Sequence, residues 1–170
     1  MQQLEIERKY LIRRPDEAYL RQNAIGSEIV QTYLLANPGE TERVRKRTDA
    51  NGTVYTHTLK RRITAVRRIE IENEISAEEY EALLQRADPA AKPIEKQRWV
   101  LVYRKQSFEI DVFPFWKKQA YMELEIRDEG QKIEFPSEIV VLREVTEDTR
   151  YTNSSLAREI PAEDREGVST

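Results

Sequence analysis

Apolar and charged side chains alternate along most of the chain, and this spacing is typical of β-strands. Eight segments show the alternation, and we expect each of them to form a strand. They are Leu4–Ile12, Glu28–Ala36, Thr41–Thr48, Thr53–Arg61, Arg67–Ile75, Ile94–Arg104, Ser107–Phe113 and Tyr121–Arg127. Asn51–Gly52 stands between the third and fourth segments and predicts a tight hairpin turn.

Helices are expected where the alternation stops. One runs from Pro15 to about Asn23, and a second covers Ser76–Ala87, where Ser76 and Glu79 form a capping box. A third, short helix is expected at Asn153–Glu159. Many short strands with few helices predict a mainly β fold, as an antiparallel barrel or sandwich. We expect a single domain over residues 1–160 and a frayed tail over 161–170.

One face of nearly every predicted strand is charged. In the first strand, Glu5, Glu7 and Lys9 share a face, and Ile6 and Tyr10 lie on the other. The remaining charged faces carry Arg43, Arg45 and Arg47; Thr58, Lys60 and Arg62; Arg68, Glu70, Glu72 and Glu74; Lys96 and Arg98; Asp111; and Glu123 and Glu125.

These faces could point to the surrounding water, or they could point inward and line a lumen. For a single strand the outward arrangement is the ordinary one. Seven strands share the pattern, however, and seven apolar faces would then have to meet in a single core. We therefore favour a barrel with its apolar faces outside and its charged faces inside. Buried like charges are costly unless they are paired or bound to ions, so such a lumen would be a binding site.

Composition narrows the function classes. Charged residues make up 35% of the chain, and 28 basic and 31 acidic residues leave a net charge of −3. This balance predicts no binding to nucleic acid or to an anionic membrane. The absence of cysteine excludes disulfides, thiolate metal sites and cysteine nucleophiles. Without an apolar N-terminal run or a stretch of 18 apolar residues, a cytoplasmic protein is expected.

The predicted lumen combines two kinds of group. Clustered arginine and lysine side chains recognise phosphate, and clustered carboxylates bind hard divalent cations. Together they indicate a polyanion that is neutralised by metal, as in phosphoryl transfer. A substrate with several phosphates suits the five basic residues Arg43, Arg45, Lys60, Lys96 and Arg98. The single histidine, His57, alternates out of phase with Thr58 and is expected on the outer face.

The charged strands also resemble the motifs of a known family. Glu5-Ile6-Glu7-Arg8-Lys9 resembles the E-x-E-x-K signature of the CYTH superfamily, also called triphosphate tunnel metalloenzymes. Further similar motifs follow in the family's order over about 150 residues of the chain. They are Arg43-Val44-Arg45, Thr58-Leu59-Lys60, Arg68-Ile69-Glu70-Ile71-Glu72, Glu95-Lys96-Gln97-Arg98, Ile110-Asp111-Val112-Phe113, Glu123-Leu124-Glu125 and the segment from Glu144 to Asn153.

This resemblance implies an eight-stranded antiparallel β-barrel around a tunnel, with divalent-metal-dependent action on a triphosphate. The chain most resembles the bacterial inorganic triphosphatases, which implies hydrolysis of inorganic triphosphate to pyrophosphate and phosphate. Mg²⁺ or Mn²⁺ is the expected cofactor, in a two-metal site. The expected roles are phosphate binding by Arg43, Arg45, Lys60, Lys96 and Arg98; one metal at Glu123 and Glu125; a second metal at Glu5, Glu7 and Asp111, with Glu72 as a further candidate; and orientation of the attacking water by Lys9.

Several alternatives stay open. Arg150 would either close one mouth of the tunnel or only anchor the C-terminal helix. The same metal and phosphate residues would also serve a class IV adenylate cyclase or a thiamine triphosphatase. A non-catalytic polyphosphate-binding protein is the third function class, although none of the acidic set is missing. The expected partner is a small triphosphate, and a homodimer is an open alternative.

Overall fold

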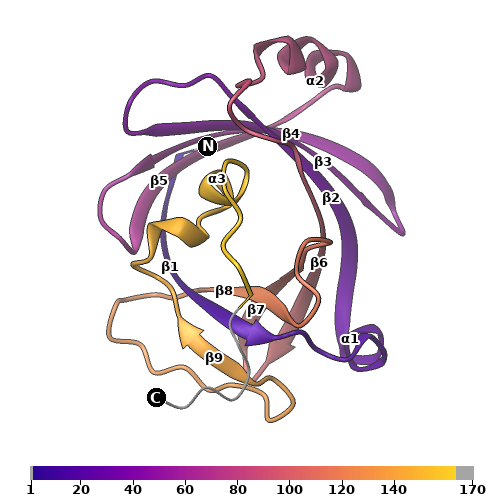
Figure 1. Ribbon diagram of the computed structural model, residues 1–170, viewed down its shortest axis with the longest axis vertical. Coiled ribbons are helices and arrows are strands. Elements are labelled where there is room, and N and C mark those ends of the chain that lie inside the picture. The colour runs from indigo at the N-terminus through magenta and orange to yellow at the C-terminus, as the bar shows by residue number, and fades with distance from the viewer. Residues whose placement is uncertain (1, 164–170) are drawn as a thin grey trace.

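The computed structural model describes residues 2–163, and side chains from residue 6 onward. Within this range, nine strands form a single antiparallel sheet with the order β5-β4-β3-β2-β6-β7-β8-β1-β9, and β5 pairs back to β1. Eight of them therefore close into the barrel seen in Figure 1. The strands are β1 (Gln2–Arg13), β2 (Ala24–Leu34), β3 (Glu40–Asp49), β4 (Gly52–Arg62), β5 (Arg67–Ile75), β6 (Ile94–Tyr103), β7 (Gln106–Val112), β8 (Gln119–Glu125) and β9 (Val141–Glu144).

The long strand β1 closes the barrel. Its residues 2–6 pair with β5, and its residues 7–13 pair with β8. The backbone N–H of Glu7 donates to the carbonyl of Val66 beside β5, and the N–H of Ile126 donates to the carbonyl of Ile6. The two edges of β1 thus hydrogen-bond to different neighbours, one beside β5 and one at the end of β8. The mainly β, antiparallel eight-stranded barrel predicted from the sequence is confirmed.

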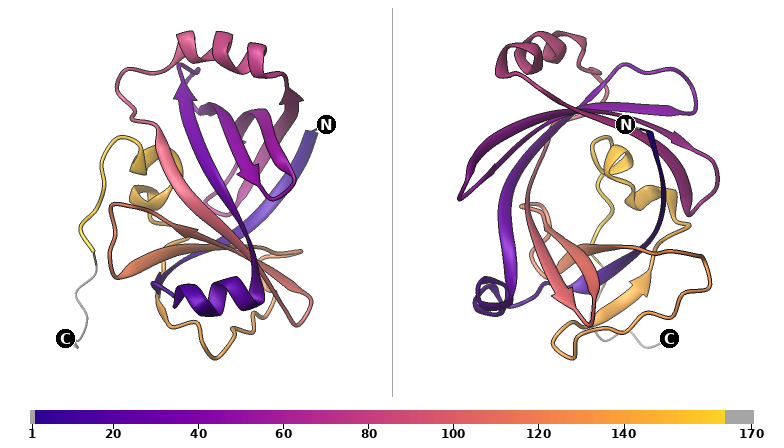
Figure 2. Two further views of the ribbon diagram at one scale, coloured as in Figure 1. Left: turned by 90° about the vertical axis from the view of Figure 1, so that its right-hand side faces the viewer. Right: turned by 180° about the vertical axis from the view of Figure 1, so that it is seen from behind.

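The apolar faces of the strands point outward and are covered by other segments. Helix α1 (Glu17–Asn23) places Leu20 in a cluster with Leu101 of β6, and Phe135 packs on the same cluster. Helix α2 (Ala77–Leu83) places Tyr80 against Val44 of β3. Both helices lie outside the ring of strands in Figure 2. The barrel therefore has its apolar strand faces outside and its charged strand faces inside, as predicted.

An apolar cluster also fills one end of the barrel interior. Leu11 and Tyr121 lie on the same strand faces as Lys9 and Glu123, and they contact the C-terminal residues Tyr151 and Leu156. The last of these belongs to helix α3 (Asn153–Leu156), which follows the short helix η2 (Thr149–Tyr151). In Figure 1, α3 lies across the opening of the barrel. We call this group, with Tyr33, Ile94, Phe113, Trp116, Val145 and Ala157, the end cluster.

The helices and the hairpin turn predicted from the sequence are present, with small changes in their first and last residues. Ser76 accepts a hydrogen bond from the N–H of Glu79 at 3.0 Å, so the predicted N-cap is confirmed, and the Ser76 hydroxyl donates to the Glu79 carboxylate at 3.2 Å. The helix turns into the 3₁₀ helix η1 (Leu84–Arg86), and α3 is shorter than predicted. The β3–β4 hairpin closes with Gly52 at φ 123°, in the left-handed region that glycine tolerates. No helix within residues 2–163 is long and apolar enough to cross a membrane.

Candidate functional site

The inward faces of the barrel surround a cavity of about 430 Å³. Its wall is built from alternating positions of the eight barrel strands and from the C-terminal segment. The lining residues are Glu7, Lys9, Tyr33, Gly39, Thr41, Arg43, Arg45, Lys60, Arg62, Arg68, Glu70, Glu72, Arg98, Ser107, Glu109, Glu123, Glu125, Thr149, Thr152, Asn153, Ser154 and Ser155. Cations and carboxylates thus share one enclosed space.

Most of the described residues that the sequence singled out reach this cavity, and three do not. The cavity wall includes Lys9, Arg43, Arg45, Lys60, Arg98, Glu7, Glu72, Glu123 and Glu125. The side chains of Lys96, Asp111 and Arg150 lie elsewhere, and the side chain of Glu5 lies outside the described residues. The shared face of a strand therefore predicted inward orientation correctly, while contacts between inward side chains decide which groups the cavity exposes.

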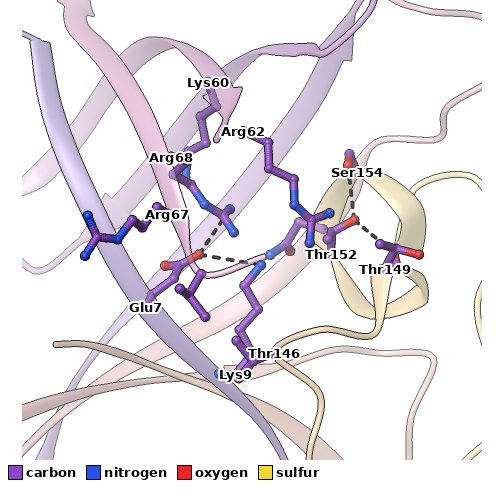
Figure 3. A network of polar contacts seen from close by, with 12 residues as sticks. Glu7, Lys9, Lys60, Arg62, Arg67, Arg68, Thr146, Thr149, Thr152 and Ser154 are labelled. Carbon is purple, nitrogen blue, oxygen red and sulfur yellow. Dashed lines mark hydrogen bonds and ion pairs between the residues drawn. The ribbon is translucent and has the colours of Figure 1, made fainter. Parts of the chain in front are cut away.

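Lys9 and Glu7 form a tight polar group with Arg68 on one side of the cavity (Figure 3). Glu7 Oε1 lies 3.5 Å from Lys9 Nζ and 3.1 Å from Arg68 Nη1. The strand is held here by the Lys9 N–H, which donates to Thr146 Oγ1 at 3.0 Å. Burial, and then the charge of Glu123, raise the pKa of Glu7 despite the nearby cations. A cation placed between these two carboxylates would relieve that repulsion.

Lys96 and Asp111, which do not line the cavity, form a closed ion cluster with Arg98, which does. Asp111 Oδ2 accepts from Lys96 Nζ at 2.7 Å and from Arg98 Nη2 at 2.9 Å, and its Oδ1 accepts from Arg98 Nε at 2.8 Å. Burial would raise the pKa of Asp111, but Arg98 and Lys96 lower it. Burial, then Arg98, lower the pKa of Lys96 to about 7. Both oxygens of Asp111 accept hydrogen bonds from these cations, so in this structure Asp111 holds Arg98, and its role as a metal ligand stays a prediction.

Arg43 and Arg45 of β3 are the contrasting pair. Within the described residues, neither has a carboxylate at ion-pair distance, and the buried Nε of each has no hydrogen-bond partner. Arg45 Nη2 donates to the neutral amide oxygen of Gln31 at 3.0 Å. Burial, then the charges of Arg43 and Arg98, lower the pKa of Arg45 to about 9. Two guanidinium groups whose buried Nε donors are open are suited to bind an anion.

Carboxylates on β1 and β8 provide the chemistry for a divalent cation. Glu7 is paired with Glu125, and Lys9 with Glu123, in the register between these strands, so the three acidic side chains share one patch of wall. Burial would raise the pKa of Glu123, but Lys9, Arg98 and Lys60 hold it well below its usual range. Within the described residues, no three acidic or histidine side chains form a ready-made cage for a metal. Mg²⁺ ordinarily binds through one or two carboxylates together with substrate phosphates, so the donors present fit that ion.

Arg150 lies away from the cavity. Its Nε and Nη2 donate to Asp148 at 3.0 and 2.7 Å, and its guanidinium covers the ring of Tyr151 at 5.4 Å. Tyr151 belongs to the end cluster, so Arg150 lies at the base of the segment that carries α3. Of the two expectations for Arg150, this position favours anchoring of the C-terminal segment.

Sequence reasoning missed part of the cavity wall. Arg62, Arg68 and Glu70 lie on charged faces that the alternation identified, and extending the same spacing would have found them and Glu109. The spacing gives no signal for the C-terminal segment, which contributes an amide and hydroxyl groups: Thr149, Thr152, Asn153, Ser154 and Ser155. Figure 3 shows Thr152 and Ser154 of that segment near Arg62. Tertiary packing of the end cluster, rather than local pattern, brings this segment to the site.

No protein-family model and no curated protein matches the chain. Among solved structures, the chain is 30% identical to the inorganic triphosphatase NE1496, with 93% of this chain and 97% of that one covered and a TM-score of 0.59. The PH1012 protein from Pyrococcus horikoshii OT3 is 19% identical, with a TM-score of 0.54 and 73% and 80% covered. A conserved hypothetical protein from Pyrococcus furiosus is 22% identical, with a TM-score of 0.53 and 74% and 80% covered. These last two show the fold alone.

An antiparallel eight-stranded barrel around a charge-lined cavity is the class of protein that the fold and the site define. The identity to NE1496 over nearly the whole of both chains gives the family. This chain belongs to the CYTH superfamily, the triphosphate tunnel metalloenzymes.

Proposed function

We propose that this protein hydrolyses inorganic triphosphate to pyrophosphate and phosphate with the help of a divalent cation. The observation that carries the proposal is the pair of guanidinium groups of Arg43 and Arg45, whose buried Nε donors have no acceptor among the described protein groups. A small polyanion would satisfy them without any further contact. The family, and the naming of its member NE1496 as an inorganic triphosphatase, support the same substrate.

The rest of the wall supports binding of a chain of phosphates rather than one phosphate. Lys60, Arg62, Arg68 and Arg98 line the same cavity as Arg43 and Arg45. Arginine offers paired donors that match phosphate oxygens, and lysine acts as a compact charge. No part of this cationic wall needs an organic group on the substrate, so inorganic triphosphate should be the preferred ligand.

A divalent cation would be held by Glu7 and Glu123, with Glu125 and Glu72 as the further carboxylates of the wall. Mg²⁺ or Mn²⁺ at these oxygens would neutralise phosphate charge and lower the pKa of a bound water. Lys9 lies beside Glu7 and is almost fully buried. We assign it to orient the attacking water by donating to its oxygen. The water oxygen then bonds to the terminal phosphorus, and the bridging P–O bond breaks. One water proton stays on the new phosphate, the other passes to the leaving pyrophosphate, and both products are released.

The experiment is a panel of triphosphates offered to the purified protein with Mg²⁺ or Mn²⁺. Phosphate, pyrophosphate and cyclic AMP are measured under identical conditions. We expect inorganic triphosphate to be hydrolysed much faster than ATP or thiamine triphosphate. Rapid formation of cyclic AMP, with inorganic triphosphate acting only as an inhibitor, would instead indicate a cyclase. Tight binding without turnover of any triphosphate would indicate a binding protein.

The metal assignment has its own test in Glu123→Gln. Removing this charge should raise the Mg²⁺ concentration that half-maximal activity requires by at least about tenfold. It should also reduce the rise in melting temperature that Mg²⁺ gives in the absence of substrate. Glu74→Gln is the matched control, because Glu74 lies on a charged strand face but outside the cavity wall. Equal metal dependence of both variants would remove Glu123 from the site.

A further inference from the structure

Strand β1 crosses a gap between two neighbouring strands at the point where it carries Glu7 and Lys9. On this edge, β5 pairs with β1 as far as Ile6, and β9 pairs with it only from Tyr10 onward. Among the described strands, residues 7–9 therefore have no partner on this edge. Buried backbone N–H and C=O groups need hydrogen-bond partners, so other groups must fill the gap.

Two groups outside the strands do so. The carbonyl of Val66 accepts from the Glu7 N–H at 3.1 Å. The side-chain oxygen of Thr146, which lies beside Lys9 in Figure 3, accepts from the Lys9 N–H at 3.0 Å. The N–H of Val145 donates to the carbonyl of Lys9 at 2.8 Å, so residues 145 and 146 hold both backbone groups of Lys9. The hydroxyl of Thr146 thus replaces the carbonyl that a neighbouring strand would supply.

The path of the chain after β9 explains why a side chain takes this place. The Asp148 N–H donates to the carbonyl of Val145 at 3.0 Å, which closes a turn over residues 145–148. Thr146 is the second residue of the turn and is 7% exposed. The backbone is turning away from β1 here toward η2 and α3, so the short hydroxyl side chain reaches the Lys9 N–H instead.

Thr146 does not belong to the wall of the tunnel cavity. It lines a separate outer groove of about 500 Å³ on the opposite side of β1, together with Arg8 and Val66. The side chain of Lys9 points into the tunnel cavity. Any effect of Thr146 on the reaction must therefore pass through the backbone of β1. A shift of about 1 Å in a reacting group can cost about a hundredfold in rate, so the place from which the Lys9 side chain starts matters.

We propose that Thr146 is the positioning residue of Lys9. Its hydroxyl oxygen fixes the β1 backbone at the level from which the Lys9 ammonium reaches the attacking water. The inference rests on the proposed function, because it takes the water-orienting role of Lys9 as given. It extends the machinery of the site from the tunnel wall to the turn that follows β9.

The first test is Thr146→Val, which keeps the shape of the side chain and removes the acceptor. The kcat for inorganic triphosphate should fall by about threefold to tenfold, while KM changes by less than about twofold, because the phosphate-binding side chains stay in place. Thr146→Ser keeps the hydroxyl and should return kcat to within about twofold of wild type. Thr32→Val is the matched control: Thr32 is as buried as Thr146 but is paired with the outer-face residue Val44, so both constants should stay unchanged.

The second test asks whether Thr146 acts through Lys9. In Lys9→Met, the ammonium that has to be placed is absent. Adding Thr146→Val to this variant should therefore lower kcat by less than about twofold. A merely structural role for Thr146 would instead lower kcat by the same factor with lysine and with methionine at position 9.

Amide hydrogen exchange tests the contact without any turnover. The amide of Lys9 should exchange at least about tenfold faster in Thr146→Val than in wild type. The amide of Leu11 is the internal reference, because Leu11 is paired with Arg143 of β9, and a general loosening of the barrel would speed both amides. Thr146→Ala serves the same measurements if Thr146→Val does not fold, because water from the outer groove can then reach the Lys9 N–H.

Each outcome decides the inference. Unchanged exchange of the Lys9 amide, wild-type kcat in Thr146→Val, or no recovery in Thr146→Ser would overturn it. An equal kcat penalty in the Lys9→Met background would overturn it as well. If the wild-type protein does not hydrolyse inorganic triphosphate, the proposed function fails, and the positioning role fails with it. If the wild type hydrolyses triphosphate while Thr146→Val is unaffected, this inference alone fails.

Discussion

Two regions of the barrel wall carry the same charge and use it differently. On β6 and β7, Lys96 and Arg98 bind both oxygens of the buried Asp111. On β3, Arg43 and Arg45 contact neutral side chains and keep unpaired Nε donors among the described residues. In the sequence, both regions look alike, as two basic residues at alternate positions. In the structure, of these four residues only Arg43 and Arg45 have buried donors without an acceptor among the described residues, so the number of basic residues in a lumen exceeds the number available to a ligand.

The comparison assigns distinct roles to the two regions. In the closed cluster, the carboxylate of Asp111 is shared by Lys96 and Arg98, so the main contribution of the cluster is to hold Arg98 in place. In the open pair, burial without a counter-ion lowers the pKa of Arg45 to about 9, and a bound anion would reverse that cost. Mutations in the Lys96–Asp111–Arg98 cluster should therefore lower the free energy of unfolding, and mutations of Arg43 or Arg45 should weaken ligand binding.

The largest effect is expected for Asp111→Ala. The change leaves Lys96 and Arg98 as buried cations without their shared carboxylate, which should cost about 3–5 kcal/mol in the free energy of unfolding. Urea denaturation measures this. Glu109→Ala is the control, because Glu109 also pairs with Arg98, at 3.0 Å, but its side chain is 42% exposed. It should cost less than about 1 kcal/mol. Equal losses in the two variants would erase the distinction between the regions.

Arg45→Ala should act on the ligand instead. Loss of one guanidinium from the open pair should lower kcat/KM for inorganic triphosphate by about a hundredfold, with KM raised and kcat lowered. The unfolding free energy should change little, because a buried charge without a counter-ion is removed. Arg47→Ala is the control: Arg47 lies on the same face of β3 but is exposed and outside the cavity wall. A destabilised Arg45→Ala protein with normal kcat/KM would place Arg45 in the structural class.

Lys9 lies between the two cases, because its ion pair with Glu7 is long, at 3.5 Å, and it still lines the cavity. Lys9→Met should lower kcat by about tenfold or more and leave KM for inorganic triphosphate nearly unchanged. Steady-state kinetics separates the two constants. A raised KM with normal kcat would move Lys9 into the phosphate-binding set with Arg43 and Arg45.

The smallest effect is expected for Arg150→Ala. Its guanidinium pairs with Asp148 and covers Tyr151 at an exposed position. Removing it should change kcat/KM by less than about twofold and stability by less than about 1 kcal/mol. The measurement is again steady-state kinetics with urea denaturation. A large loss of kcat/KM would show that Arg150 reaches the ligand when the cavity is filled, as the tunnel-mouth expectation required.

The alternation of the strands predicted the fold and the direction of each side chain, because period two is a direct consequence of strand geometry. It could not predict which inward side chains are covered. Lys96 and Asp111 share the inward parity of Arg98, and Asp111 is paired with Arg98 in the register, yet neither lines the cavity. Lys96 donates to Asp111 and to Asn153 of the C-terminal segment, and these are contacts that strand spacing does not reveal. Strand β9 is too short and too exposed to show a pattern. Gln31 is uncharged, so a search for charged faces passes over it, although it is fully buried between Arg45 and Tyr33.

The central claim is that the open arginine pair binds the phosphate chain, and a crystal structure with inorganic triphosphate and Mg²⁺ tests it most directly. Hydrolysis during crystallisation can be slowed with Lys9→Met, which leaves the phosphate-binding wall intact. The account predicts phosphate oxygens within hydrogen-bond distance of Arg43 Nε and Arg45 Nε, with the Lys96–Asp111–Arg98 cluster unchanged. A triphosphate bound without contact to either arginine, or one that breaks the Asp111 cluster to recruit Lys96, would contradict it.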